Sequence, residues 1–154
     1  MKRKTILTAA FLILLGLTES QAQTLQSNRN MEELKLTKEW DKTFPKSDKV
    51  NHSKVTFVNR YGITLAADLY VPKTTVGEKL PAIAVSGPFG AVKEQSSGLY
   101  AQTLAERGFL TIAFDPSFTG ESGGQPRGVA SPDINTEDFS AAVDYLATRP
   151  DVDA

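Results

Sequence analysis

The stretch from Leu80 to Gly124 constrains the fold of this chain more than any other. It begins with a short apolar run, 81–85, which is long enough for a buried strand and too short for a helix. A second apolar run covers 109–114, and the segment 98–107 between them carries apolar residues near helical spacing. Two apolar strands joined by a helical crossover form a parallel unit with a right-handed connection. The sequence therefore predicts an α/β fold with a mostly parallel sheet.

A glycine-rich loop follows each of these two strands. The first begins Ser-Gly-Pro-Phe-Gly at 86–90, and the second runs from Asp115 to Gly124. Ligands of open α/β sheets gather beyond the carboxyl ends of the strands, where both loops must lie. The candidate site is therefore expected at these loops.

The remaining segments surround this unit. The segment from Val50 to Val71 is predicted to be an antiparallel hairpin, because two alternating apolar runs, 54–58 and 63–71, flank a turn. Before them, 31–44 reads as a short helix or as an extended arm laid across the domain by Trp40 and Phe44. Packing alone is the simpler role for that arm.

A last helix is expected near the end of the chain. Asn135 or Thr136 caps it, Pro150 stops it, and acidic residues in its first turn favour the positive end of its dipole. Its buried face is predicted to consist of Phe139, Ala142, Val143 and Leu146.

The length, charge and cysteine content of the chain limit the functions to be considered. The 154 residues suit one modest domain, and 17 basic against 18 acidic residues give no reason to expect a nucleic-acid surface. The chain has no cysteine, which excludes disulfides and a lipid-modified cysteine. Asp41, Asp48 and Asp68 have no metal-ligand spacing around them, and His52 reads as a surface residue before the first strand.

The amino terminus has the order of a secretory signal. Basic residues at 2–4 precede an apolar run at 6–17, and Ser20 and Ala22 fit the small positions before a cleavage point. An uncleaved membrane anchor is the alternative, but the run is short for a span. We expect an exported protein, periplasmic or extracellular and free of the membrane after cleavage behind Ala22. The predicted organisation is a signal peptide at 1–22, an N-terminal arm at 23–50 and a partial domain at 51–154.

Three sequence segments carry a family resemblance. They are Gly-Pro-Phe-Gly-Ala-Val-Lys-Glu-Gln at 87–95, Ala-Phe-Asp-Pro-Ser-Phe-Thr-Gly-Glu-Ser-Gly-Gly at 113–124, and Ala-Ala-Val-Asp-Tyr-Leu at 141–146. With the order of the elements, they resemble the first half of an α/β-hydrolase of the dienelactone-hydrolase-like and Xaa-Pro-peptidase-like branches. The resemblance covers about 54–153, and the two loops are its specific part.

This resemblance implies a hydrolase of carboxylic esters, lactones or amides that acts on small molecules and needs no cofactor. In such enzymes a Ser or Cys nucleophile sits on an elbow after the fifth strand, and the acid and histidine follow later. The one Gly-x-Ser-x-Gly match, at 120–124, lies in the loop after the predicted fourth strand and not after a fifth, and the sole histidine, His52, lies before the predicted strands. We therefore expect an N-terminal half, truncated before the nucleophile strand and inactive alone. A non-catalytic binding module or a truncated gene product is the alternative.

A dinucleotide- or phosphate-binding unit is a third, weaker alternative. The loop at 87–90 lacks the Gly-x-Gly-x-x-Gly fingerprint, and no Gly-Lys-Ser/Thr follows it.

By the same resemblance, the loop after the third strand supplies one backbone donor to an oxyanion hole. Pro88 has no N–H, so the N–H of Phe89 is the best candidate. Gly87 stands where many relatives carry a histidine, and with Pro88 and Gly90 it is a candidate for the substrate cleft. The alternative is that 87–90 is only a tight turn.

The second loop offers further candidates. Ser117 and Phe118 are candidates to line the cleft, although Ser117 and Ser122 can also serve as loop hydrogen-bonding residues. Ser122 stands in a Gly-x-Ser-x-Gly run, 120–124, but no histidine is placed by the fold to activate it, so it is not expected to be the nucleophile. Asp115 is expected to cap its own turn rather than to act in catalysis.

The resemblance also predicts how the sheet ends. In the α/β-hydrolase order the third strand lies between the fourth and the fifth. Without a fifth strand, 82–85 would be an apolar edge through which the chain self-associates.

Overall fold

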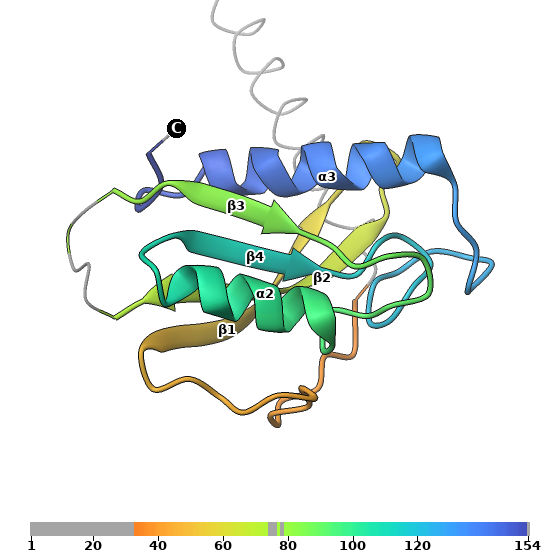
Figure 1. Ribbon diagram of the computed structural model, residues 1–154. Helices are drawn as coiled ribbons and strands as arrows, with labels where there is room; N and C mark the ends of the chain where they lie inside the picture. The colour runs from red at the N-terminus through yellow and green to blue at the C-terminus, as the bar shows by residue number, and fades with distance from the viewer. Residues whose placement is uncertain (1–32, 74–76, 78, 154) are drawn as a thin grey trace, which may run out of the picture. The chain divides into compact units, whose positions relative to one another are not determined.

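The computed structural model describes residues 33–73, 77 and 79–153. Its elements, shown in Figure 1, are the strands β1 (Val50–Val58), β2 (Thr64–Pro72), β3 (Ala82–Val85) and β4 (Leu110–Phe114), and the helices α2 (Ser96–Ala105) and α3 (Pro132–Ala147). The predicted signal peptide and the start of the predicted arm lie outside the described residues. Neither described helix has the length and apolar character needed to cross a membrane.

The four strands form one sheet in the order β1-β2-β4-β3. β3 and β4 are parallel, with Ala84 opposite Ile112, so the predicted strand–helix–strand unit is confirmed. β1 pairs with β2, and β2 with β4, in antiparallel fashion. The described sheet is therefore mixed, because the hairpin joins directly to the edge of β4.

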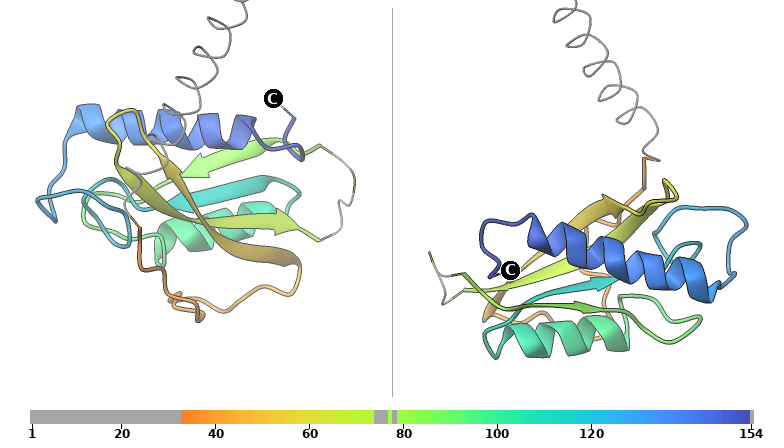
Figure 2. Two further views of the ribbon diagram at one scale, coloured as in Figure 1. Left: turned by 180° about the vertical axis from the view of Figure 1, so that it is seen from behind. Right: turned by 90° about the horizontal axis from the view of Figure 1, so that it is seen from above.

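Side-chain alternation along β4 divides the core between the two faces of the sheet. Leu110, Ile112 and Phe114 pack with the buried residues of α3. Thr111 and Ala113 face α2, where the Thr111 hydroxyl donates to the Ala101 carbonyl at 2.8 Å. Figure 2 shows the two helices on opposite faces, so β4 is covered on both sides.

The described part of the N-terminal arm, residues 33–49, is extended and contains no helix. It packs beside α2 on the same face of the sheet. The Thr43 amide donates to the Glu94 carbonyl at 3.0 Å, and the ring of Phe44 lies over Gly98, where an added Cβ would meet it at 3.1 Å. The helical alternative for this part of the arm is therefore wrong, and the packing role of Trp40 and Phe44 is confirmed.

α3 differs from its prediction in its start and in its buried face. It begins at Pro132, because proline suits the first helical position, and Ser131 rather than Asn135 or Thr136 is the N-cap. Ala142 and Leu146 are buried as predicted, but Phe139 and Val143 are 42% and 55% exposed. The buried set is instead Asp138, Ala141, Ala142 and Leu146. The buried face of α3 therefore differs from the predicted one. The Asp138 carboxylate is buried because it accepts hydrogen bonds from the Asn59 side chain and from the amide and hydroxyl of Ser117.

β3 is an edge strand, and the start of its outer side is already paired. Val152 forms a parallel bridge with Leu80. The Leu80 amide donates to Asp151, and the Asp153 amide donates to Leu80, each at 2.9 Å. Beyond this bridge, the described residues provide no partner for the outer side of β3, whose four residues are all half-buried.

We propose that the isolated chain self-associates through this edge, because an unpaired apolar strand is a template for another chain. Sedimentation velocity on residues 23–154 is expected to show dimers or larger species. Ile83→Lys, which places a charge on the edge, should increase the monomer fraction, whereas Ile83→Val should not. A cooperatively melting monomer of the unsubstituted chain at all concentrations would contradict the proposal.

Candidate active site

The two glycine-rich loops lie together at the carboxyl ends of β3 and β4. They line a small cavity of about 60 Å³ with the start of α3. Gly87, Pro88, Phe89 and Gly90, four of the predicted site residues, line it, and Asn135 contributes from α3. Ser117 and Phe118 are not among its lining residues. The structure therefore brings together the first-loop candidates but not those of the second loop.

Phe89, which lines this cavity, has a backbone amide without a hydrogen-bond partner among the described residues. The residue as a whole is 77% exposed. The turn that contains it is closed by the Ala91 amide, which donates to the Pro88 carbonyl at 3.0 Å. Gly90 adopts a φ of +82°, a conformation that favours glycine. The loop thus holds a free backbone donor in a defined turn.

Gly87 has little room for a side chain. An added Cβ would lie 3.0 Å from the Cβ of Ala91 and 3.7 Å from the Ser97 hydroxyl. The Ser97 hydroxyl is buried and has no hydrogen-bond partner in the described part of the chain. A histidine at position 87 would have to displace Ala91, so this loop packs more tightly than the resemblance implied.

Asp115 organises the second loop from a completely buried position. Its Oδ2 accepts the amide of Glu121 at 2.9 Å, so it caps its own loop as expected. Its Oδ1 accepts the Lys93 amide at 2.7 Å, and its Oδ2 accepts the Lys93 ammonium at 2.9 Å. The side chain has the role predicted for it, and it also binds the other loop.

The second loop's serines are also engaged inside the protein. Ser117, completely buried, donates its hydroxyl to Asp138 at 2.8 Å and accepts from Asn59 at 3.2 Å. The Ser122 hydroxyl donates to the Asp115 carbonyl at 2.7 Å. Both serines therefore serve the hydrogen bonding of the loop. The adjacent Phe118 is 8% exposed and has a φ of +70°.

The position predicted for His52 is wrong. It lies within β1, which begins at Val50, before the alternating run at 54–58, and its side chain is only 13% exposed. Its Nε2 lies 2.8 Å from an oxygen of the completely buried Asp68, whose other oxygen is 2.9 Å from the buried Lys42 ammonium. The sequence gives little signal for this group, because its three members lie in the arm, β1 and β2.

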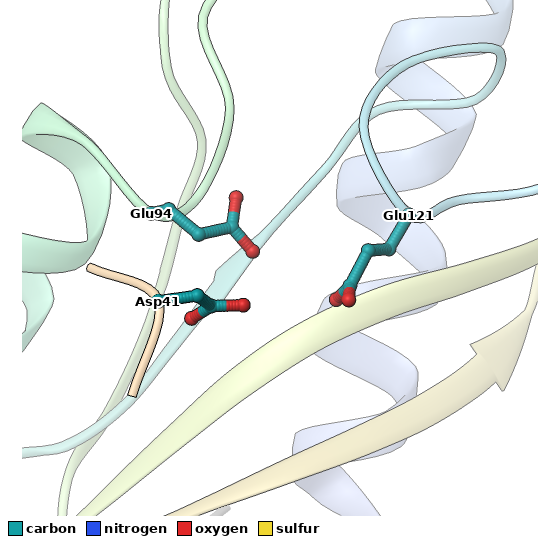
Figure 3. A group of neighbouring side chains, drawn as sticks. All are labelled: Asp41, Glu94 and Glu121. Carbon is teal, nitrogen blue, oxygen red and sulfur yellow. The ribbon is translucent and has the colours of Figure 1, made fainter. Parts of the chain in front are cut away.

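Three carboxylates, Asp41, Glu94 and Glu121, converge from segments far apart in the chain, as Figure 3 shows. Their oxygens lie within 4.8 Å of one another, close enough to hold a cation. Lys54 already holds that position: its ammonium is 2.7 Å from Asp41, 2.6 Å from Glu121 and 3.6 Å from Glu94. We therefore interpret the group as an ion-pair network, which the Lys93 ammonium joins through Glu94 and Glu121.

The network shifts the pKa values of its members. Burial alone would raise the pKa of Glu121, but hydrogen bonds from Lys54 and Lys93 outweigh it and lower the pKa from 4.5 to about 2. Burial likewise opposes the lowering of the Asp41 pKa to about 2, which bonds from Lys42 and Lys54 produce. Burial would lower the pKa of Lys93, yet the Asp115 carboxylate raises it above the ordinary value. All three groups are charged at neutral pH.

The lowered carboxylate pKa values predict a loss of stability in acid. Groups whose pKa falls on folding stabilise the folded state above their unfolded pKa, and this stabilisation disappears as pH falls towards the folded value. Between pH 5 and pH 2 the urea midpoint should therefore decrease. Glu121→Gln should be less stable at neutral pH by about 1–3 kcal/mol and should show a smaller decrease in acid. An equal decrease in both proteins would contradict this.

Gly120 provides a separate test of the buried Asp115. An added Cβ there would lie 2.2 Å from Asp115 Oδ2, at a φ of +52°. Gly128 also has a left-handed φ, +70°, but nothing within 4 Å of an added Cβ. Gly120→Ala should therefore reduce the free energy of unfolding by about 1–3 kcal/mol more than Gly128→Ala. Urea unfolding measures the difference, and equal losses would show that Asp115 is not packed against position 120.

Comparison with known proteins places this arrangement in a family. Residues 61–153 match the X-Pro dipeptidyl-peptidase (S15 family). An uncharacterized protein of Pseudomonas aeruginosa is 68% identical over 153 residues, which are 97% of this chain and 41% of that protein. A thiohydrolase of Aspergillus aculeatus is 31% identical over 70% of this chain and 32% of its own length. The chain thus spans less than half the length of these relatives.

Solved structures agree with the fold. The crystal structure of a hypothetical protein from Pseudomonas aeruginosa superposes with a TM-score of 0.77 at 75% identity, covering 79% of this chain and 38% of that one. An α/β-hydrolase from a Penicillium species gives a TM-score of 0.60 at 26% identity, over 67% of this chain and 34% of that one. The predicted resemblance is confirmed: the chain has part of an α/β-hydrolase fold and belongs to the X-Pro dipeptidyl-peptidase S15 family.

Proposed function

We propose that this chain is the N-terminal part of an exported hydrolase that cleaves carboxylic esters, lactones or amides. A Ser or Cys nucleophile, a histidine and an acid would come from the rest of the whole protein. The observation that carries the proposal is the unbonded Phe89 amide at the carboxyl end of β3, beside a sheet edge that has only begun to be paired. No metal or organic cofactor takes part in the proposed chemistry.

The proposed reaction gives the Phe89 N–H a defined task. Attack of the nucleophile on the carbonyl carbon turns the carbonyl oxygen into an oxyanion. Two backbone N–H groups stabilise that charge, one from the residue after the nucleophile and one from Phe89. The intermediate then collapses, the leaving group takes a proton from the histidine, and water hydrolyses the acyl-enzyme. The free N–H supports this task, because a donor already bonded inside the protein would not be available.

The position of β3 supports delivery of the nucleophile to this site. The Val152–Leu80 bridge starts a parallel pairing along the outer side of β3. A strand continuing in this direction would run towards the carboxyl end of β3, where Phe89 lies. An elbow at the end of that strand would then reach the cavity beside the glycine-rich loops.

Substrate class is proposed from chemistry and from the relatives. A relative in Aspergillus aculeatus is named a thiohydrolase, and one solved neighbour, Est1E from Butyrivibrio proteoclasticus, was determined with bound ferulic acid. That neighbour has 25% identity and a TM-score of 0.56, over 64% of this chain and 39% of its own. Both fit acyl transfer through an oxyanion, which esters, thioesters and amides share. Export rests on the predicted signal at 1–22 and the predicted cleavage after Ala22.

The alternative is a non-catalytic module. It concerns the chain taken alone, in which Ser117 and Ser122 are committed to internal hydrogen bonds and His52 lies against Asp68. Residues 23–154 by themselves are therefore expected to give no turnover of an activated ester above the rate that denatured protein gives.

Replacing the Phe89 amide by an ester tests the oxyanion role in the whole protein. Incorporating phenyllactic acid at this position removes the N–H and keeps the ring. We expect kcat for p-nitrophenyl acetate to fall about 10²-fold, with little change in KM. Phe89→Ala keeps the N–H and serves as the control, which should retain kcat within a few-fold. An ester-substituted protein with an unchanged kcat would contradict the oxyanion role of the Phe89 N–H.

A further inference from the structure

The glycine loop, residues 86–92, is fixed at both of its ends to the same place, the carboxyl end of β4. At the first end, the Ser86 hydroxyl donates to the Phe114 carbonyl at 3.2 Å. At the second end, Lys93 is bound to Asp115, the next residue after Phe114. The turn that carries the Phe89 amide lies between these two attachments.

The second attachment is the stronger one. Lys93 and Asp115 are both completely buried. The Lys93 amide donates to Asp115 Oδ1 at 2.7 Å and its ammonium donates to Oδ2 at 2.9 Å, so one carboxylate binds both the backbone and the side chain of one residue. Hydrogen bonds with a charged partner are roughly twice as strong as neutral ones, and two of them fix orientation as well as distance.

Further charges hold the ammonium in place. Glu121 lies 2.8 Å from the Lys93 ammonium, and Glu94 also pairs with it. Burial would lower the pKa of Lys93, but the Asp115 carboxylate, with Glu121 and Glu94, outweighs it and raises the pKa, so the side chain remains charged. Removing the ammonium would leave the buried Asp115 carboxylate without its cation, which is costly in a low-dielectric interior.

The turn passes the position of Lys93 on to Phe89. Only three residues separate the two, and the Ala91 amide closes the turn on the Pro88 carbonyl at 3.0 Å. A movement of Lys93 along β4 must therefore move the Phe89 amide. Misplacing a catalytic group by about 1 Å costs about 10²-fold in rate.

We infer that Lys93 is a positioning residue: its ion pair with Asp115 sets where the Phe89 N–H points. The inference rests on the proposed function and adds to it a residue that does not itself touch the substrate.

Lys93→Met in the whole protein tests the inference kinetically. It removes the charge and keeps a side chain of similar length. We expect kcat for p-nitrophenyl acetate to fall ten- to a hundredfold with KM changed less than threefold. The matched control is Lys42→Met, which removes another completely buried ammonium, one that binds Asp41 and Asp68 beneath the arm. This control should lose stability but keep kcat within twofold. Equal falls in kcat for the two variants would overturn the inference.

A second readout separates this inference from the proposed function. With ¹⁵N-phenylalanine in the whole protein, the Phe89 amide resonance can be assigned through Phe89→Leu. The resonance should shift in Lys93→Met and stay in place in Lys42→Met, whether or not the protein hydrolyses esters. Absence of hydrolysis in the native protein would remove the proposed function, whereas an unmoved Phe89 resonance in Lys93→Met would remove the positioning role.

Asp115→Asn provides the same test if Lys93→Met does not fold. The amide side chain keeps an acceptor for the Lys93 backbone and loses the charge. The Phe89 resonance should again shift, by less than in Lys93→Met, and an unchanged resonance would contradict the inference.

Discussion

The buried ion pair between Lys93 and Asp115 is the constraint on which the rest of the candidate site depends. It joins the loop after β3 to the loop after β4, two segments that the strand order alone would leave free to move separately. The packing around it is tight, because Gly120 leaves no room for a Cβ against the Asp115 carboxylate. A site built from loops is thus fixed to the end of the central strand β4.

The same charges extend from the loops to the N-terminal arm. Glu121 binds both Lys93 and Lys54, and its Oε1 accepts the Thr37 amide of the arm at 2.6 Å. Asp41 of the arm binds Lys54 in turn. The arm therefore covers β1 and β2 and also neutralises the interior next to the site. The buried Lys93 is tolerated because three carboxylates pair with it, and the buried Asp115 because the Lys93 ammonium and two backbone amides bind it.

Sequence reasoning found the parts whose signal is local. The strands β3 and β4, the helix between them and the turn at Phe89 follow from apolar runs and from glycine and proline at fixed positions. The edge position of β3 followed from the family resemblance. The hairpin from Val50 to Val71 was also predicted, although residues 50–53, where Trp40 of the arm packs against the cluster containing Val50, show no alternation.

The sequence did not predict the ion pairs between residues far apart in the chain. Lys93 and Asp115 stand 22 residues apart, and nothing in the spacing indicates that a charged pair is buried. The buried face of α3 was mispredicted for the same reason: Asp138 is buried by long-range partners, whereas an acidic residue on a helix ordinarily faces solvent. His52 was misplaced because its partner Asp68 comes from the neighbouring strand. Such pairs depend on the folded arrangement and leave no periodic pattern.

A crystal structure of the whole protein after reaction with an ester-like phosphonate would test the central claim most directly. The reagent bonds to the nucleophile and places a negatively charged oxygen where the oxyanion forms. The account predicts that oxygen within about 2.7–3.1 Å of the Phe89 amide nitrogen, with Lys93 still bound to Asp115. A phosphonyl oxygen held elsewhere, with the Phe89 N–H directed away from it, would contradict the account.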